Sequence, residues 1–182
     1  MRASVKRALV IRVSVIRVPS IRNRRRSKRV AAIALLLQLS LCGVSIADDE
    51  RDSKVMAVLD QYLEALNVLD LERHVETYHF PHYRHAGTKI TVWKNAREAM
   101  PILEVDKSER RAWLRQTLAE DWDRSEWTRR EIVQADASKV HVATTFVRLR
   151  KDGSEIASFD SLYVLTFEEG RWAIKGRSSF AP

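Results

Sequence analysis

The chain has 182 residues and a formal net charge of +8, with 45% hydrophobic and 31% charged residues. Eleven of its 32 Lys and Arg residues fall within residues 1–47, which contain no Asp or Glu. The other 135 residues therefore carry 21 basic and 24 acidic side chains, a net charge of −3. A mildly acidic body lacks the basic surface that nucleic-acid binding requires, so we predict no nucleic-acid partner.

Residues 1–47 contain the three parts of a secretory signal peptide. Residues 22–29 (RNRRRSKR) are basic, residues 30–41 are apolar, and Ser45 and Ala47 occupy the small-residue positions of a cleavage site. We therefore expect a periplasmic or extracellular protein with its domain at residues 48–182. The alternative is an uncleaved membrane anchor, because the 18 residues from Val30 to Ala47 reach the lower limit for a span.

The first 29 residues are long for the basic region of a signal peptide, which we interpret as a start-site extension. Cys42 is the only cysteine and lies in the leader. The cleaved chain would have no thiol, so we predict neither disulfides nor thiol chemistry. We also predict no cofactor.

The predicted domain begins with a segment of helical periodicity. Apolar residues recur at steps of three and four over residues 52–67, with Asp52 or Ser53 as the N-cap. Asp70 is expected to cap a second, short helix that ends before Pro81. Its buried face would consist of Leu71, Val75 and Tyr78.

The next segments predict a hairpin and further helical pieces. Residues 83–86 and 89–93 flank Gly87 as a turn residue, and residues 95–98 (NARE) form a capping-box pattern. Pro101 interrupts that helix and Ser108 restarts it. The polar loop at residues 121–127 (DWDRSEW) carries Trp122 and Trp127, a pair that suggests a lid or a protein interface.

From residue 128 the apolar period changes from 3.6 to 2. Strands are predicted at residues 128–134, 139–150, 155–167 and 171–180, with Asp152-Gly153 and Glu169-Gly170 as tight turns. Helices followed by an antiparallel meander predict an α+β fold. The long strands favour a strongly curved sheet wrapped around a helix.

The element order resembles the nuclear transport factor 2-like superfamily, and within it the SnoaL-like group. The motifs are residues 62–67 (YLEALN), 70–72 (DLE), 170–174 (GRWAI) and Tyr78. The resemblance implies a cystatin-like cone, with N-terminal helices packed into a curved antiparallel sheet that forms a conical pocket. Members include ketosteroid isomerases, dehydratases, epoxide hydrolases, polyketide cyclases and non-catalytic proteins, so the fold does not determine the function.

The ketosteroid isomerases of this superfamily use one tyrosine and two acids. Tyr62 resembles the tyrosine that donates to the oxyanion, but the base position falls on Ala86, beside His85, and the second acid position falls near Leu162. One part of three matches, so we do not predict that isomerase. His85 remains the candidate base, because imidazole exchanges a proton near neutral pH; the alternative is a rim histidine without a role.

Three histidines spaced by three residues, His79, His82 and His85, invite a metal site. On a strand, however, His82 and His85 face opposite ways. Glu72 or His141 could complete a site, but we predict no metal.

The expected ligand is a small hydrophobic or aromatic molecule, contacted by Tyr78, His82, Trp93 and Phe146. Five tryptophans in so small a domain suit a pocket for a flat ligand. Alternation leaves open whether Phe146 or the opposite face of its strand lines the pocket. Along the last strand it places Arg177 opposite the apolar side chains, which favours a salt bridge at the sheet rim or dimer face over a place in the cone.

The expected function is thus ligand binding by an exported domain that forms a homodimer through the sheet. The alternative is a lyase, isomerase or cyclase with His85 or His82 as base and Tyr62 as oxyanion donor. A protein-interaction module is a third class that the sequence leaves open.

Overall fold

The computed structural model describes residues 27–181, with side chains from Ala47 onward. Its helices are α1 (Ser27–Asn67), α2 (Leu71–Glu76), α3 (Ala96–Ala99), the 3₁₀ helix η1 (Pro101–Glu104) and α4 (Arg110–Leu118). Its strands are β1 (Tyr78–Ala86), β2 (Lys89–Trp93), β3 (Arg124–Ala135), β4 (Lys139–Leu149), β5 (Glu155–Glu168) and β6 (Arg171–Ser179).

The chain divides into two units between Gly43 and Val44, and the second unit is described below. The basic part of the predicted leader lies largely outside the described residues. Among the residues that are described, we find no helix both long and apolar enough to cross a membrane.

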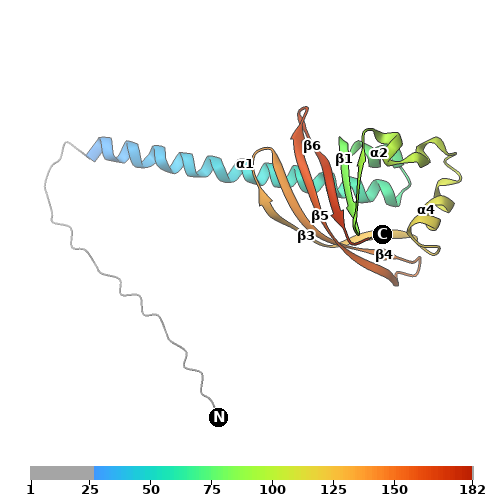
Figure 1. The fold of residues 1–182 in the computed structure, drawn as a ribbon. Helices are drawn as coiled ribbons and strands as arrows, with labels where there is room; N and C mark the ends of the chain where they lie inside the picture. Colours follow the sequence, from blue (N-terminus) through green and yellow to red (C-terminus); the bar gives the residue numbers. More distant parts are fainter. Residues whose placement is uncertain (1–26, 182) are drawn as a thin grey trace, which may run out of the picture. The chain divides into compact units, whose positions relative to one another are not determined.

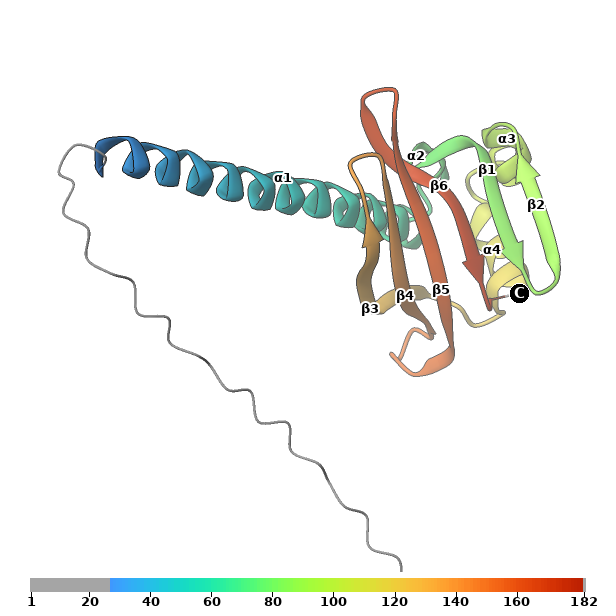
Figure 2. The same ribbon diagram turned by 60° about the vertical axis from the view of Figure 1, so that its left-hand side comes forward.

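The second unit confirms the predicted α+β class. One six-stranded sheet has the order β2-β1-β6-β5-β4-β3. β1 and β6 run parallel, and the other neighbours pair antiparallel. The sheet is strongly curved and does not close on itself (Figures 1 and 2). Because β1 pairs with β6, the first strand of the chain lies next to the last strand of the chain in the sheet.

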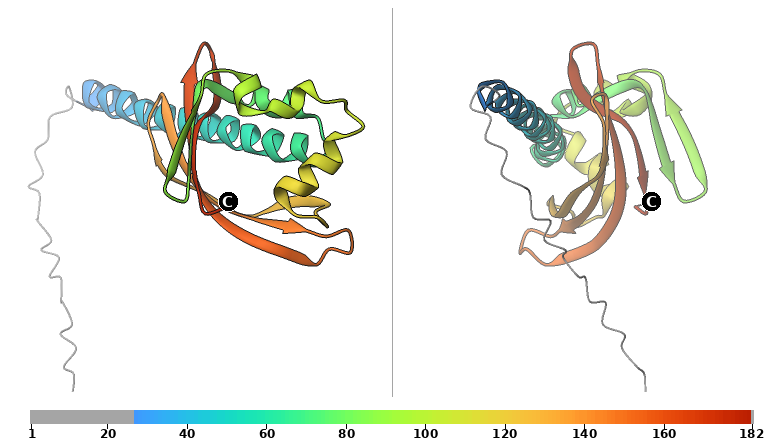
Figure 3. Two further views of the ribbon diagram at one scale, coloured as in Figure 1. Left: turned by 45° about the vertical axis from the view of Figure 1, so that its right-hand side comes forward. Right: turned by 90° about the vertical axis from the view of Figure 1, so that its left-hand side faces the viewer.

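The C-terminal turns of α1 lie across the concave face of the sheet, near α4 (Figure 3). Val55 and Leu59 of α1 are fully buried, and they pack in one cluster with Val140, Val142 and Leu165 of the sheet. Burying one such aliphatic side chain stabilises a fold by about 1.5–3 kcal/mol. None of these five side chains lines the cavity described below.

Local signals place the short helices. The Asp70 carboxylate accepts a hydrogen bond from the Arg73 amide at 3.2 Å and caps α2. Asn95 and Glu98 form the predicted capping box, because the Asn95 side chain accepts from the Glu98 amide and the Glu98 carboxylate accepts from the Lys94 amide.

The first helix differs from the prediction. It does not begin at a cap near residue 52, because α1 continues through that point from Ser27.

The predicted turns are present. Gly87, Gly153 and Gly170 have φ of +56°, +85° and +77°, where a side chain would be strained. β1 starts at Tyr78, five residues earlier than predicted, and runs through a cis Phe80–Pro81 bond. Its main-chain bonds to β6 hold this early part in the sheet.

The two tryptophans of residues 121–127 form neither a lid nor an exposed interface, which corrects the prediction. Trp122 is fully buried in a second core cluster with Leu71, Ile102 and Leu114. Its indole N–H donates to the Ser125 hydroxyl at 3.1 Å, so the polar residues around it serve to satisfy a buried ring. Trp127 lies on β3 and faces the cavity.

Candidate functional site

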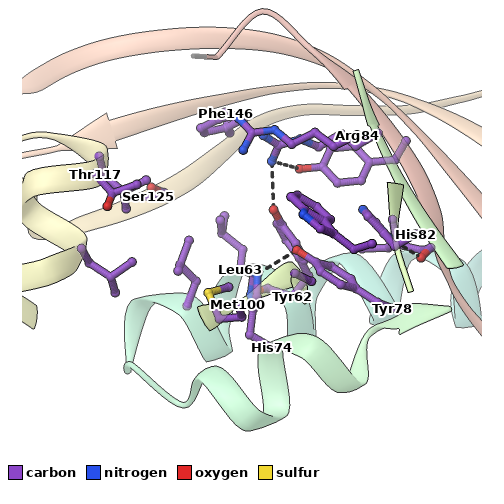
Figure 4. A pocket seen from close by; sticks show the side chains of 18 of the residues that line it. Tyr62, Leu63, His74, Tyr78, His82, Arg84, Met100, Thr117, Ser125 and Phe146 are labelled. Atoms are coloured by element: carbon purple, nitrogen blue, oxygen red, sulfur yellow. Dashed lines mark hydrogen bonds between the residues drawn. The ribbon is translucent and has the colours of Figure 1, made fainter. Parts of the chain in front are cut away.

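A cavity of about 170 Å³ occupies the concave side of the sheet (Figure 4). Its lining comes from every helix except η1 and from all six strands. In the close-up, Tyr62, Tyr78 and His74 gather on one side, and Thr117 and Ser125 lie on the other. The cavity is thus the point where the helices and the curved sheet meet.

A hydrogen-bonded chain of rings forms one wall. His74 Nδ1 lies 2.7 Å from the Tyr62 carbonyl oxygen, and His74 Nε2 lies 3.2 Å from the Tyr78 hydroxyl. A carbonyl can only accept, so Nδ1 carries the proton and Nε2 accepts from Tyr78. The Tyr62 ring packs against the His74 ring at a tilt of 38°, with centroids 4.3 Å apart. Helix α2 therefore contributes one imidazole that bridges the main chain of Tyr62 and the hydroxyl of Tyr78.

Burial sets the charge of the histidines in this wall. It lowers the pKa of His74 to about 4, against the hydrogen bond to the Tyr62 carbonyl, and the nearby Arg177 charge adds to the effect. Burial likewise lowers the pKa of His82 to about 4, with Arg177 and Arg84 contributing. Both imidazoles are neutral at pH 7.

Arg177 lies in the cone, which corrects the placement predicted from alternation. β6 pairs Ile174 with Leu165 and Gly176 with Val164, so Lys175 is an extra residue, a β-bulge. The bulge reverses the alternation, and Ile174 and Arg177 both line the cavity. Arg177 Nη1 donates to the Tyr62 hydroxyl at 2.9 Å and to the Tyr163 hydroxyl at 3.1 Å.

The guanidinium changes the acidity of these phenols unequally. Burial would raise the pKa of Tyr62, but the Arg177 charge and the hydrogen bonds from neighbouring tyrosines outweigh it and lower that pKa. The pKa values of Tyr78 and Tyr163 are raised, chiefly by burial. Tyr62 is therefore the most acidic phenol of the cluster.

Two further arginines line the same cavity. Arg84 comes from β1, and Arg148 comes from β4. Arg148 Nη1 donates to the Leu118 carbonyl oxygen at 2.7 Å, and its guanidinium carbon lies 4.8 Å from the centre of the Phe159 ring. Burial lowers the pKa of Arg84 and of Arg148, and the charge of Arg177 adds to both shifts. Arginine nonetheless stays charged at pH 7.

Aromatic rings form the remaining walls. The His82 ring is stacked between Tyr78, at 4.1 Å between centroids, and Trp93, at 5.6 Å. Its Nδ1 donates to the Ile174 carbonyl oxygen at 3.0 Å. Trp127 meets Phe146 edge-on at 6.1 Å. Contacts of this kind hold the rings in place before any ligand arrives.

The structure brings most of the predicted site residues to one cavity. Tyr62, Tyr78, His82, Trp93 and Phe146 all line it. Phe146 and the residues in phase with it thus form the inner face of β4, which alternation alone left open.

His85 lies elsewhere. It is exposed and is not among the lining residues, whereas His82 and Arg84, which share the opposite face of β1, line the cavity. His79 also points away from His82, with Nδ1 3.0 Å from the Thr166 hydroxyl. Across the residues with described side chains, no group of three or more His, Cys, Asp or Glu is placed to hold a metal.

Sequence reasoning missed several members of the site. His74, Arg84, Arg148 and Tyr163 were not singled out, although all line the cavity. One usable signal was present: Arg148 and Phe146 lie two residues apart on a strand and so share a face. A set of arginine and tyrosine donors beside aromatic walls can bind the oxygen of a carbonyl or an anion.

Comparisons with solved structures show the same fold. A cystatin-like protein of unknown function from Nostoc punctiforme is similar with a TM-score of 0.56 and 14% identity, covering 72% of this chain and 90% of that one. An NTF-2 like protein of unknown function from Shewanella oneidensis gives 0.55 and 16%, covering 71% and 98%. An NTF2-like protein with a cystatin-like fold from Novosphingobium aromaticivorans gives 0.55 and 12%, covering 87% and 92%.

These identities establish a shared fold and nothing finer. No curated protein sequence matches the chain. A family model described as NTF2-like protein (DUF6841) matches residues 49–179, which include the whole curved sheet and the helices that close it. The chain belongs to this NTF2-like family.

Proposed function

We propose that the protein is a binding domain that holds a small aromatic molecule in its cone. The observation that carries this proposal is the cavity itself, which is walled by aromatic side chains. These are Tyr62, Tyr78, Trp93, Trp113, Trp127, Phe146 and Tyr163. Flat, rigid walls bury a flat ligand with little loss of side-chain freedom.

The size of the cavity limits the ligand. An apolar cavity of about 150 Å³ is enough to hold benzene, and this one measures about 170 Å³. Pockets for drug-sized molecules begin at roughly 300 Å³. A compound with one aromatic ring and a short substituent fits, whereas a steroid-sized ligand would require the walls to move.

Binding of a neutral probe tests the proposal. Benzyl alcohol is titrated into the full chain, and binding is monitored by ligand-observed NMR and by tryptophan fluorescence. Both signals should reach saturation. Ala99→Phe fills the cavity from α3 and should abolish binding, because Ala99 lines it. Ala112→Phe adds the same ring on the exposed face of α4 and is the matched control. Equal binding by the two variants would refute a site in the cone.

A second candidate is proton-transfer catalysis, favoured by the Arg177–Tyr62 contact of 2.9 Å. In this mechanism His82 Nε2 removes a proton from the carbon beside a carbonyl, Tyr62 donates a hydrogen bond to the enolate oxygen, and the proton then returns to carbon. His85 is unsuited to the role of base because its exposed ring lies outside the cavity.

Exchange of ketone protons in D₂O, observed by NMR with phenylacetone, tests the second candidate. Activity should disappear in Tyr62→Phe and fall in His82→Gln, and it should persist in His85→Gln. Wild-type exchange no faster than in buffer would exclude this reaction for that ketone and leave the binding function intact.

The proposal includes export and self-association. The basic and apolar segments of residues 1–47 support export, and N-terminal sequencing of protein from the extracellular or periplasmic fraction would test it. Tyr83 and Leu162 are exposed apolar residues on the outward-facing side of β1 and β5 and support a homodimer through the sheet. Light scattering of wild type and Leu162→Glu would test that dimer, which the variant should weaken.

A further inference from the structure

Three arginines face one cavity from three different strands. Arg84 lies on β1, Arg148 on β4 and Arg177 on β6. Among the described residues that line the cavity, none is Asp or Glu. The polar part of the site therefore has a formal charge of +3, in a body whose net charge is −3.

Such a cluster is unfavourable when the cavity is empty. Arginine does not deprotonate at neutral pH, so the three like charges repel one another in surroundings where water screens them poorly. Arg148 donates to a carbonyl oxygen and Arg177 to two phenol oxygens, which are neutral acceptors. A bound anion would relieve the repulsion, and its affinity would be correspondingly high.

The arginines also lie beside the aromatic walls. Arg177 bonds Tyr62 and Tyr163, and Tyr163 meets the Trp127 ring edge-on at 5.8 Å. Arg148 is two residues from Phe146 on the same face of β4. One ligand can therefore touch the charged and aromatic parts of the site together.

We propose that the cone selects a small aromatic carboxylate, with its ring against Trp127 and Phe146 and its carboxylate among Arg84, Arg148 and Arg177. This inference rests on the proposed binding function and adds the chemical class of the ligand. A carboxylate matches the planar donor geometry of a guanidinium. The aromatic walls favour it over inorganic phosphate, which has no apolar part to bury.

Calorimetry on the full chain tests the charge requirement with matched probes. Benzoate and benzamide have nearly the same shape, and only benzoate is an anion. Benzoate should bind about 10-fold to 100-fold more tightly than benzamide at low salt, as expected for charge-assisted hydrogen bonds. Raising the salt concentration should weaken benzoate more than benzamide.

Variants then assign the arginines. Arg84→Gln and Arg148→Gln should each reduce benzoate affinity about tenfold or more and change benzyl alcohol affinity less than about threefold. Arg84→Lys keeps the charge and should recover part of the loss. Arg97→Gln removes an exposed arginine of α3 and should have no effect. The probe comparison on wild type stands even where a variant fails to fold.

The outcomes separate the two proposals. Equal affinity for benzoate and benzamide would overturn the carboxylate assignment and keep an aromatic binding site. Tighter binding of inorganic phosphate than of benzoate would also overturn the assignment. Failure of benzoate, benzamide and benzyl alcohol alike would overturn the binding function itself.

Discussion

The buried histidines should make the protein less stable as the pH falls from 7 to 4. His74 and His82 are each only 2% exposed, and burial lowers the pKa of each from 6.5 to about 4. In that interval the unfolded chain binds protons at these two positions that the folded chain does not bind. Stability therefore rises with pH between about 4 and 6.5 and levels off above that range.

The magnitude follows from the shift. One pKa unit corresponds to about 1.4 kcal/mol, and a shift from 6.5 to about 4 gives about 3 kcal/mol for His74. His82 adds a similar amount, because burial lowers its pKa to about 4 as well. Losses of this size are a large fraction of the stability of an ordinary domain.

Urea denaturation of the full chain at pH 7.0, 5.5 and 4.5 measures the effect. The variant His74→Gln retains an amide that can donate to the Tyr62 carbonyl and accept from Tyr78, but it cannot titrate. Its free energy of unfolding should depend on pH less steeply than that of wild type, by about 1.4 kcal/mol per pH unit. His85→Gln makes the same substitution at an exposed position of β1 and is the matched control. Equal slopes in wild type and His74→Gln would refute the reasoning.

Three further substitutions test individual contacts by urea denaturation at pH 7. Asp70→Ala removes the cap of α2 and should cost about 1 kcal/mol, whereas Asp70→Asn should be nearly neutral; equal losses would contradict a capping role. Arg110→Ala breaks hydrogen bonds of 2.7 and 2.8 Å to Glu72. Because the half-exposed Glu72 carboxylate stays solvated, the free energy of unfolding should fall by about 2 kcal/mol, less than for a fully buried ion pair. Gly176→Ala places a Cβ 3.2 Å from the Tyr83 carbonyl oxygen and should cost about 1–2 kcal/mol by displacing β1 from β6; an unchanged midpoint would show that the strands yield freely.

Much of the fold could be predicted because its signals are local. A cap such as Asp70 or Asn95 acts on an amide three residues away, and a glycine such as Gly170 responds to its own backbone angle. The strand period from residue 128 onward is likewise visible within one segment. The resemblance to the superfamily rested on the same features, and the family match confirms it.

The site was less predictable because it depends on which face of each strand turns inward. Tyr62 and Phe146 were correctly expected near a pocket, but the choice between His85 and Arg84 depends on how β1 pairs with β6, almost a hundred residues away. A one-residue error in phase moves every side chain to the other face. The predicted acid–base residue and the arginine that the structure places in the cavity are therefore sequence neighbours.

Arg177 shows that strand pairing decides which side chains of β6 face the cavity. Deleting Lys175 should leave Arg177 inside the cone, because Ile174, Gly176 and Arg177 would then alternate regularly against β5 in the pairing that they already have. The deletion also removes a partly exposed ion pair of Lys175 with Glu168, which contributes little. A crystal structure of the deletion variant should retain the hydrogen bond from Arg177 to Tyr62. An Arg177 side chain on the outer face would show that the bulge itself, and not the pairing with Tyr163, holds it in the cone.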